Sequence, residues 1–505
     1  MGDIGERKPK VVIVGAGMAG LAAAHRLQSC SGDILDLVVV EAGDRIGGRI
    51  FTSEFSGSRI EMGATWIHGI DGSPVYDMAK KAGALIPDDH GGFPFPFERM
   101  DGLRSEPLTV AEGGRVVDAS MISRISALFS HLKDLIASGE AGDDSPSVGA
   151  FLRRGFQSYL ASREIGADWT EAAAFAMYEY GERTYTAVDD LESLDLAAEK
   201  EYKEFPGEHI TLPGGYSRIP NFLSSRLPAG AIRFGRNVSL IEWRPAGSAG
   251  IDPVRIHFED GGMEYADHAI VTVSLGVLKA GLNVTVDGAP GLAFSPPLPE
   301  KKREAIRRLG FGLVNKLFME LKGGGENDRS PFPSLRMAFD PARHVASIPR
   351  WIRRTESIFP IHSGSRVLLA WFVGGEAAEI EKMDDDEIIR GIHATLDGFS
   401  PPPRAAAAAD AAFGKIARIR RSGWGRDPRF LGSYSYVAVG SSGDDQDELA
   451  KPLPEGGISP APLQILFAGE ATHRTRYATT HGAFLSGVRE ADRLIQHYGL
   501  RSCGF

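Results

Sequence analysis

Lys316 is the side chain of this sequence whose surroundings best suit chemistry. It stands amid apolar residues in the run LGFGLVNKLFME, which covers residues 309–320. The run has the spacing of a strand. A lysine in such a strand either extends its charged end to solvent, which is the commoner case, or is held inward for chemistry. Lys316 is therefore a candidate catalytic group.

A histidine and a run of carboxylates are two further candidates for chemical roles. His68 lies in the run EMGATWIHG, residues 61–69, where glycines allow a ligand to approach the backbone closely. A histidine considered alone is more often structural than catalytic. Five carboxylates follow between residues 189 and 199. Most acidic runs are simply solvated, but one or two members of this one could turn inward and bind amine charges.

These side chains need a scaffold, and the stretch 10–49 indicates its type. An apolar β-branched run at 11–14 is followed by the glycine-rich turn GAGMAG at 15–20. An Ala/Leu-rich segment and a second apolar run, LVVVE at 37–41, come next. The order strand, glycine turn, helix, strand predicts a βαβ unit.

The glycine turn of this unit has the spacing of a dinucleotide site. Gly15 permits the tight turn, and Gly17 lets the backbone approach a pyrophosphate at the helix N-terminus. Gly20 lets helix and strand pack closely. Glu41 follows about twenty residues later, where a carboxylate can bind ribose hydroxyls. We therefore predict a bound dinucleotide.

Two other segments extend this site. Arg49 follows two glycines in the run GDRIGGRI, so it suits a second clamp on the same pyrophosphate. Near the end of the chain, a predicted helix at 482–494 presents an N-terminus that favours an electron-rich group, such as one edge of a reduced flavin. Glu470, shortly before it, is a candidate ligand for ribityl hydroxyls.

Composition limits the class of protein. With 505 residues and 43% hydrophobic content, the chain can form two or more domains with their own cores. Its net charge of -10 argues against nucleic acid as a partner and favours a cationic substrate weakly. Only Cys30 and Cys503 occur, so we expect no disulfide framework, no metal site and a reducing compartment. Secretory, membrane-spanning and lipidation patterns are missing, so we expect a cytoplasmic protein with no membrane partner.

Four ordered sequence blocks add a family resemblance. They are EMGATWIHG at 61–69, VNK at 314–316, GSYSYV at 432–437 and FAGEATHRT at 467–475. Together with the glycine turn, they resemble the flavin-dependent amine oxidase family, and within it the plant polyamine oxidases of the cytosolic thermospermine/spermine oxidase type. The resemblance covers nearly the whole chain.

The resemblance implies an α/β, two-domain amine oxidase fold. A discontinuous Rossmann-like domain would bind FAD non-covalently through residues 1–85, 207–290 and 420–505. An α+β substrate-binding domain would comprise residues 86–206 and 291–419. We expect the protein to act as a monomer.

The resemblance also implies the reaction. A hydride leaves the carbon beside a secondary amine of spermine or thermospermine for flavin N5, and water hydrolyses the resulting imine to a shorter polyamine and an aminoaldehyde. O₂ then reoxidises the flavin and yields H₂O₂. The reacting nitrogen must be neutral, whereas the distal ammonium groups should stay charged and be held by carboxylates.

Residue roles follow by resemblance. Lys316 would hold a water near N5, and His68 would hydrogen-bond the substrate or tune its protonation. Tyr434 should form one wall of an aromatic cage beside the flavin. The facing wall, which is tyrosine in many relatives, is Thr479 here, as in spermine-type enzymes, and this leaves the cage open on one side.

Binding residues are expected in two groups. For the distal amines we predict Glu192 and Asp195. The residues expected to bind the cofactor are Gly15, Gly17, Gly20, Glu41, Arg49, Gly63, Ala64, Thr65, Trp66, Val238, Glu470 and Thr480.

Three alternatives remain open from the sequence. A nicotinamide-dependent dehydrogenase would share the βαβ unit but gives no reason for the segments 45–49 and 470–483. A histone-demethylase-like amine oxidase would carry a long helical insertion that does not fit between the motifs. A flavin-binding regulatory protein with little turnover would have no need for both Lys316 and His68.

Overall fold

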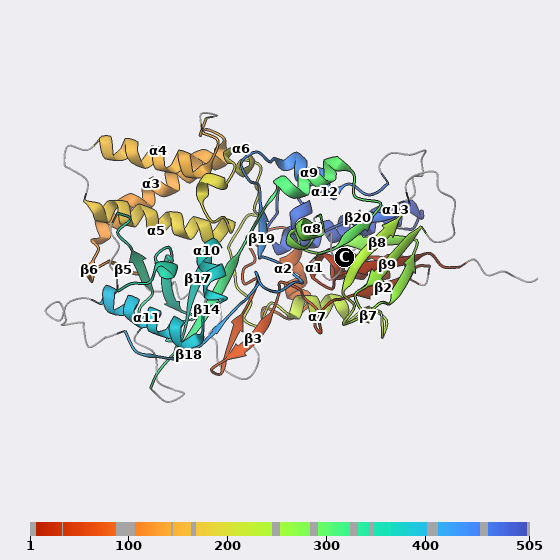
Figure 1. Ribbon diagram of the computed structural model, residues 1–505, viewed down its shortest axis with the longest axis horizontal. Coiled ribbons are helices and arrows are strands. Elements are labelled where there is room, and N and C mark those ends of the chain that lie inside the picture. The colour runs from red at the N-terminus through yellow and green to blue at the C-terminus, as the bar shows by residue number, and fades with distance from the viewer. Residues whose placement is uncertain are drawn as a thin grey trace, which may run out of the picture.

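The structure is a computed structural model with two halves arranged along its long axis (Figure 1). The ranges that it describes are 7–32, 34–86, 107–142, 145–162, 168–244, 253–282, 291–323, 332–342, 347–362, 364–400, 413–454 and 463–501.

The first half is organised by a five-stranded sheet in the order β20-β11-β1-β2-β7. All neighbouring strands in it are parallel. Its central strand β1 is apolar on both sides, because both faces of the sheet are covered. The elements of this sheet and of the helices on one face are β1 (Lys10–Val14), α1 (Met18–Ser31), β2 (Asp36–Val40), α2 (Pro74–Lys81), α7 (Arg218–Ser224), β7 (Ile232–Arg233), β11 (His268–Val271), β20 (Ile465–Phe467) and α13 (Thr480–His497).

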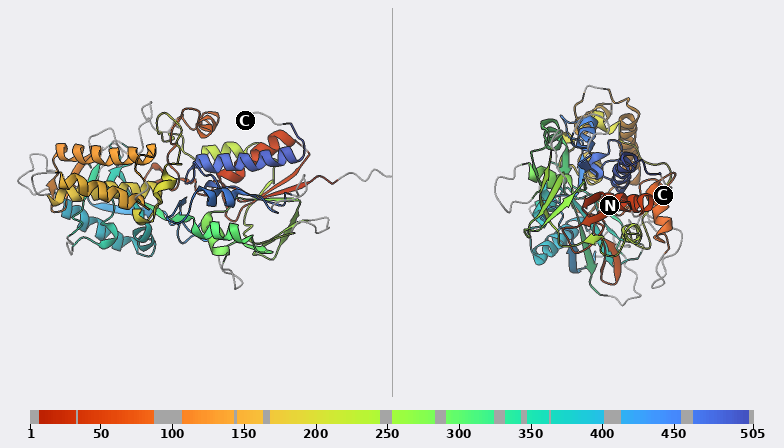
Figure 2. Two further views of the ribbon diagram at one scale, coloured as in Figure 1. Left: turned by 90° about the horizontal axis from the view of Figure 1, so that it is seen from above. Right: turned by 90° about the vertical axis from the view of Figure 1, so that its right-hand side faces the viewer.

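The helices α1 and α13 lie side by side on one face of this sheet, as the adjacent red and blue helices of Figure 2 show. The other face packs against a smaller sheet, β10-β9-β8-β12, and three helices. These elements are β8 (Val238–Trp243), β9 (Val254–Phe258), β10 (Met263–Ala266), α8 (Leu275–Gly281), β12 (Ala293–Ser295), α9 (Glu300–Arg308) and α12 (Gly443–Ala450). The predicted βαβ unit is therefore confirmed.

The second half contains a seven-stranded mixed sheet in the order β18-β14-β17-β16-β15-β5-β6. One face of it packs on α10 and α11 in a shared core, and α3, α4 and α5 form a helical layer (Figure 1). The elements are β5 (Leu108–Ala111), β6 (Arg115–Val116), α3 (Ala119–Ser138), α4 (Val148–Ala161), α5 (Trp169–Thr186), β14 (Val314–Leu321), β15 (Leu335–Ala338), β16 (Ser357–Pro360), β17 (Val367–Val373), α10 (Gly374–Ile380), α11 (Asp385–Phe399) and β18 (Ile416–Arg421).

Short elements connect the two halves. A two-stranded pair joins β13 to β19, and a hairpin joins β3 to β4. The connecting elements are β3 (Thr52–Phe55), β4 (Ser58–Glu61), the 3₁₀ helix η1 (Leu191–Ser193), α6 (Leu196–Glu199), β13 (Gly310–Gly312) and β19 (Tyr434–Tyr436). Two other 3₁₀ helices lie within the halves: η2 (Arg350–Ile352) packs in the core of the second half, and η4 (Glu470–Thr472) packs on α12 and α13 of the first.

The described strands divide nearly as the predicted segments do. The difference lies at residues 291–309, which we assigned to the substrate-binding part. Leu292, Leu298 and Ile306 instead pack in the same core as Val12 and Val14 of β1. Apolar side chains in and next to β12 and α9 thus cover the dinucleotide-binding half, and the second insertion begins after them.

Two structural findings concern the expectations drawn from composition. Cys30, near the end of α1, is disulfide-bonded, and no cysteine among the described residues is free. The expectation that the cysteines are unbridged is therefore wrong, although the second cysteine, Cys503, lies outside the described residues. None of the described helices combines the length and the apolar composition needed to cross a membrane.

Candidate active site

A cavity of about 760 Å³ receives side chains from both halves of the molecule. Its lining includes the glycine turn after β1 and the N-terminus of α13. It also includes one face of the seven-stranded sheet, through Lys316 and Trp371. The glycine turn predicted to hold a dinucleotide and the lysine predicted to do chemistry therefore face one continuous space.

The glycine turn has the backbone geometry of a phosphate cradle. Gly17 caps α1 without any side-chain hydrogen bond, so the first N–H groups of the helix are free of a side-chain cap. Gly15 has φ of +105°, which favours glycine. A Cβ on Gly48 would approach the Cα of Gly17 to 3.3 Å. Glycine at position 48 thus lets the loop after β2 lie close over the helix terminus.

Gly20 has a packing role and does not line the cavity. A Cβ at this position would lie 2.0 Å from the carbonyl oxygen of Gly15. The absence of a side chain therefore lets α1 lie directly against the turn. This is the role that the sequence spacing predicts for the third glycine.

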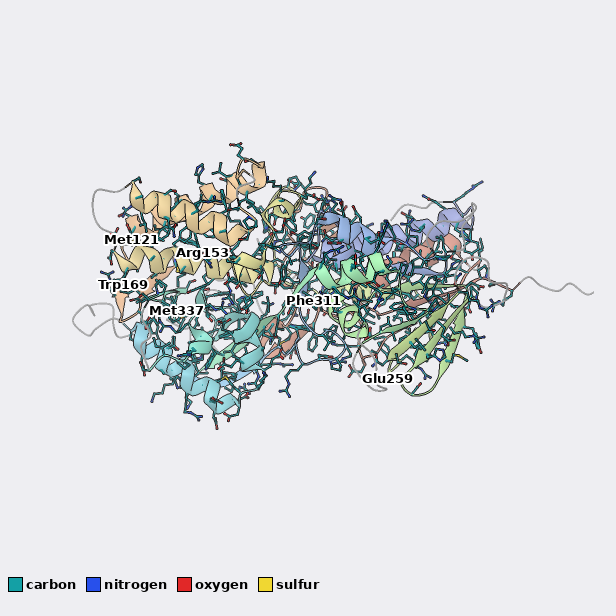
Figure 3. The ribbon with its side chains drawn as sticks, turned by 45° about the horizontal axis from the view of Figure 1, so that its top comes forward. Met121, Arg153, Trp169, Glu259, Phe311 and Met337 are labelled. Atoms are coloured by element: carbon teal, nitrogen blue, oxygen red, sulfur yellow. The ribbon has the colours of Figure 1, made fainter. Side chains whose placement is uncertain are left out.

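Glu41 lies at the end of β2 and borders the cavity. Its two carboxylate oxygens accept hydrogen bonds of 2.8 Å from the backbone N–H groups of Ala16 and Gly43. Each oxygen has a second lone pair, so a ribose hydroxyl remains a compatible partner. Val238 and Glu259, from the smaller sheet, border the same space, and Figure 3 labels Glu259 at that sheet.

Arg49 and Glu470 form an ion pair at the wall of the cavity. The Nη1 of Arg49 donates to Glu470 Oε1 at 2.9 Å and to the carbonyl oxygen of Ser433 at 2.8 Å. The other oxygen of Glu470 accepts from the Ser435 hydroxyl at 2.5 Å and from the N–H of Ala478 at 2.8 Å. Glu470 therefore fixes Arg49 at the cavity wall, and its carboxylate already has protein donors on both oxygens.

The residues of the predicted block 63–66 line the cavity beside Arg49. A Cβ on Gly63 would lie 1.9 Å from the carbonyl oxygen of Arg49, so glycine is needed for this close approach. Ala64, Thr65 and Trp66 continue along the wall. All four were predicted to bind the cofactor, and they lie where the glycine-rich segment 47–49 meets β14.

Lys316 points into the protein and is only 3% exposed. Its Nζ donates hydrogen bonds of 2.7 Å to the carbonyl oxygens of Glu61 and Gly63, and it also contacts the Thr65 hydroxyl. The ring of Trp371 lies beneath it, with the centroid 4.5 Å from Nζ. Burial lowers the pKa of Lys316 to about 7. The negative charge of Glu61 raises this pKa and so offsets part of the effect of burial. The amine can thus gain or lose a proton near neutral pH.

Glu61 is a functional candidate that the sequence analysis did not single out. Its carboxylate is 2% exposed and accepts from the backbone N–H of Tyr216 at 2.9 Å and from the Thr52 hydroxyl. Burial raises the pKa of Glu61 to about 7, while these hydrogen bonds lower it. Its place at the start of the run 61–69, two residues before the predicted block 63–66, was the available signal.

Aromatic side chains form the walls around Lys316. Tyr434 borders the cavity, and its hydroxyl donates to the carbonyl oxygen of Thr184 at 2.5 Å. Trp371, Tyr185 and Tyr202 are further lining residues. Tyr434 was predicted from the sequence, but the other three rings were not, because they lie on separate elements of the two insertions.

The N-terminus of α13 faces the same cavity. Thr479 caps the helix by accepting from the N–H of Gly482 at 3.0 Å, so it has a structural task beside its predicted place in the cage. Thr480 lines the cavity and shares a hydrogen bond of 2.5 Å with the Tyr216 hydroxyl. The positive end of this helix therefore suits an electron-rich group, as predicted.

His68 lies at the cavity in a small polar cluster. Its Nδ1 is 3.0 Å from Nδ1 of His209, and Nε2 of His209 is 3.4 Å from a carboxylate oxygen of Glu204. These three residues offer ligand atoms within 4.8 Å of one another, although no metal site was predicted. Burial lowers the pKa of His68 to about 4, so its ring is neutral at physiological pH and can accept a hydrogen bond.

Glu192 and Asp195, predicted to bind distal amines, are not among the residues that line the cavity. Asp195 caps α6 by accepting from the N–H of Ala198. Glu192 accepts from Ser147 at 2.6 Å and pairs with Arg153 at 2.9 Å. Figure 3 labels Arg153 in the helical layer, away from Phe311 at the junction of the halves. The structure thus gives both carboxylates partners outside the site.

Comparison with known proteins identifies the family to which this chain belongs. A family model described as flavin containing amine oxidoreductase matches residues 18–495. The chain belongs to this family. It is 52% identical to rice (Oryza sativa subsp. japonica) polyamine oxidase 1 over 97% of the chain and 98% of that protein. It is 45% identical to probable polyamine oxidase 5 of Arabidopsis thaliana, over 99% and 100% of the two chains. A bovine (Bos taurus) peroxisomal N(1)-acetyl-spermine/spermidine oxidase is 35% identical over 97% and 95%.

The chain is therefore an FAD-dependent amine oxidase of the plant polyamine oxidase type with the two-domain fold. The residues present fit the cofactor. The uncapped N-terminus of α1 and the glycine contact between Gly17 and Gly48 suit a pyrophosphate, and Glu41 suits a ribose. The cavity continues from there to Lys316 and Tyr434, where the reactive ring would be held. FAD accepts the hydride when it is bound.

The titration of Lys316 and Glu61 predicts a pH dependence for the reaction with O₂. Below pH 7 Lys316 is protonated and Glu61 neutral, so the site is more positive and stabilises the negative charge that develops on O₂. Mixing chemically reduced holoenzyme with O₂ avoids the titration of a substrate amine. We expect the oxidation rate to fall as pH rises through about 7. A rate that rises with pH over this range would contradict the assignment.

Proposed function

We propose that the protein oxidises the carbon next to a secondary amine of spermine or thermospermine. The products would be a shorter polyamine, an aminoaldehyde and H₂O₂. The observation that carries the proposal is the single cavity that joins the dinucleotide-binding turn to a buried lysine and a set of aromatic walls. A long flexible amine with apolar methylene segments matches such a channel.

The residues around Lys316 suit an amine that must lose its proton before it reacts. The apolar and aromatic surroundings disfavour a charged nitrogen, as the lowered pKa values of Lys316 and His68 show. His68 stays neutral and can accept a proton or a hydrogen bond from the substrate. Tyr434 and Trp371 would hold the methylene chain between their rings and orient the reacting carbon.

Product analysis tests this proposal. The holoenzyme would be incubated with spermine, thermospermine or spermidine, and the products identified by mass spectrometry together with an assay for H₂O₂. We expect spermine and thermospermine to give a triamine, an aminoaldehyde and H₂O₂. Release of ammonia from a terminal primary amine, with the carbon chain intact, would contradict the proposal.

Two further parts of the proposal derive from the sequence. We propose that the enzyme acts as a monomer and that it resides in the cytoplasm. Size-exclusion chromatography with light scattering tests the first, and subcellular fractionation tests the second. A stable dimer, or enrichment in an organelle fraction, would contradict the respective statement.

A further inference from the structure

Glu356 is a cavity carboxylate without a role in the chemistry described above. It immediately precedes β16 and lines the same cavity as Lys316. Burial raises the pKa of Glu356, and the nearby guanidinium of Arg336 opposes this only in part. A group with these properties is a candidate partner for a cation.

The order of the strands in the seven-stranded sheet gives the approximate distance between Glu356 and Lys316. The strands β14, β17, β16 and β15 are consecutive neighbours. Lys316 pairs with Trp371 across the first two, and Arg336 pairs with Ser357 across the last two. Glu356 immediately precedes Ser357 of β16, so, because adjacent strands lie about 4.8 Å apart, the two spacings from β14 to β16 place its backbone about 10 Å from that of Lys316. A span of about 10 Å suits an amine with several nitrogen atoms along its chain better than a small monoamine.

The surface between these two points is mainly apolar. Paired residues of antiparallel strands share a face, so Lys316, Trp371, Leu369 and Phe359 project from the same side of the sheet. All four line the cavity. This wall therefore carries Lys316 at one end and apolar groups beyond it, and the Glu356 carboxylate lines the same cavity just before the start of β16.

The carboxylate of Glu356 is incompletely compensated. Its Oε1 is 3.6 Å from Nε of Arg336, which is longer than a hydrogen bond. Arg336 also lies over the ring of Tyr178, 5.6 Å from its centroid. The Glu356 side chain keeps 27% of its surface exposed toward the cavity. An incoming ammonium group would therefore find a free acceptor.

Helix α5 makes room for this carboxylate. A Cβ on Gly181 would lie 2.9 Å from Oε2 of Glu356 and 3.2 Å from its Cδ. Glycine inside a helix is unfavourable by about 1 kcal/mol relative to alanine. Gly181 also lines the cavity. A residue that is unfavourable in a helix therefore stands where the helix approaches the Glu356 carboxylate closely.

We propose that Glu356 binds the distal ammonium group of the polyamine substrate, and that Gly181 keeps the space that this contact needs. The inference rests on the proposed function, because it takes the polyamine as the substrate. It assigns to Glu356 the task for which the sequence indicated Glu192 and Asp195. It also explains how one channel can hold a neutral nitrogen at Lys316 and a charged nitrogen further along.

Glu356→Gln tests the proposal, because it keeps the size of the side chain and removes its charge. Holoenzyme kinetics would be compared for spermine and for N1,N12-diacetylspermine, whose ends carry no charge, used as substrate or competitive inhibitor. We expect KM for spermine to rise about 10- to 100-fold with little change in kcat, as for loss of a charge-assisted hydrogen bond. The constant for the diacetylated compound should stay within about twofold of its original value.

A second variant and a binding measurement keep the test independent of turnover. Gly181→Ala leaves the charge in place but crowds the carboxylate, and it should weaken spermine selectively as well. Anaerobic calorimetry with spermine should show a loss of affinity in both variants, larger in Glu356→Gln than in Gly181→Ala. Glu379→Gln, at an exposed position of α10, is the matched control and should behave as the unaltered enzyme.

The outcomes separate the two proposals. If the unaltered enzyme neither binds nor oxidises spermine, the proposed function fails. If it oxidises spermine but Glu356→Gln affects spermine and the diacetylated compound equally, or affects neither, the role of Glu356 is wrong. Flavin content and thermal midpoint of each variant establish that the comparison concerns folded holoenzyme.

Discussion

Lys316→Met should slow flavin reduction by spermine or reoxidation by O₂ by about 100-fold or more, because a positioned proton-transfer group contributes at least this factor. Methionine retains a flexible apolar stem but cannot donate to the carbonyl oxygens of Glu61 and Gly63. The wall around Trp371 should stay packed, so FAD should remain bound. Stopped-flow spectroscopy of the two half-reactions measures the effect.

A matched control strengthens this prediction. Lys382→Met changes an exposed lysine near the end of α10 and should leave both half-reactions unaltered. The pH dependence of the reaction with O₂ should also lose the contribution of Lys316 in Lys316→Met. Unchanged rates of both half-reactions in Lys316→Met would show that Lys316 has no part in the chemistry.

Gly20→Ala should abolish tight FAD binding. The added Cβ would lie 2.0 Å from the carbonyl oxygen of Gly15, a backbone atom that cannot rotate away. Relief of this contact requires α1 to move from the turn, which separates its N-terminus from the phosphates. An overpacking cost of about 3 kcal/mol corresponds to a loss of more than 100-fold in affinity. The ratio of flavin to protein absorbance after purification, and titration of the apoprotein with FAD, measure it.

Gly423→Ala is the control for this variant. Gly423 has an ordinary φ, and a Cβ there would meet no atom within 4 Å. It should bind FAD as the unaltered enzyme does. Retention of full flavin content by Gly20→Ala would overturn the packing role of this glycine.

The dinucleotide-binding part could be predicted because its signals are local. The β-branched run of β1, the glycine spacing and the Ala-rich start of α1 lie within one short stretch, and each has one physical reading. The contact between Gly20 and Gly15 follows from that spacing alone. The N-terminus of α13 was predictable for the same reason, since a glycine-containing segment leads into a periodic helix.

The substrate side could be predicted only in part. The apolar residues of β14 indicate a strand but not the direction of each side chain, so the inward direction of Lys316 depends on strand pairing across the sheet. Glu192 and Asp195 belong to an acidic run whose members also suit helix caps and surface ion pairs, and this is how the structure uses them. No sequence motif identifies Glu356, because its partners lie on α5 and β15 and are therefore not its neighbours in the sequence.

Anaerobic mixing of the purified holoenzyme with spermine tests the central claim most directly, because it isolates the transfer of electrons from the amine. The account predicts that the absorbance of the oxidised flavin bleaches within the enzyme's turnover time and that one equivalent of aminoaldehyde per flavin is formed. A holoenzyme that retains its oxidised spectrum with spermine, thermospermine and spermidine would contradict it.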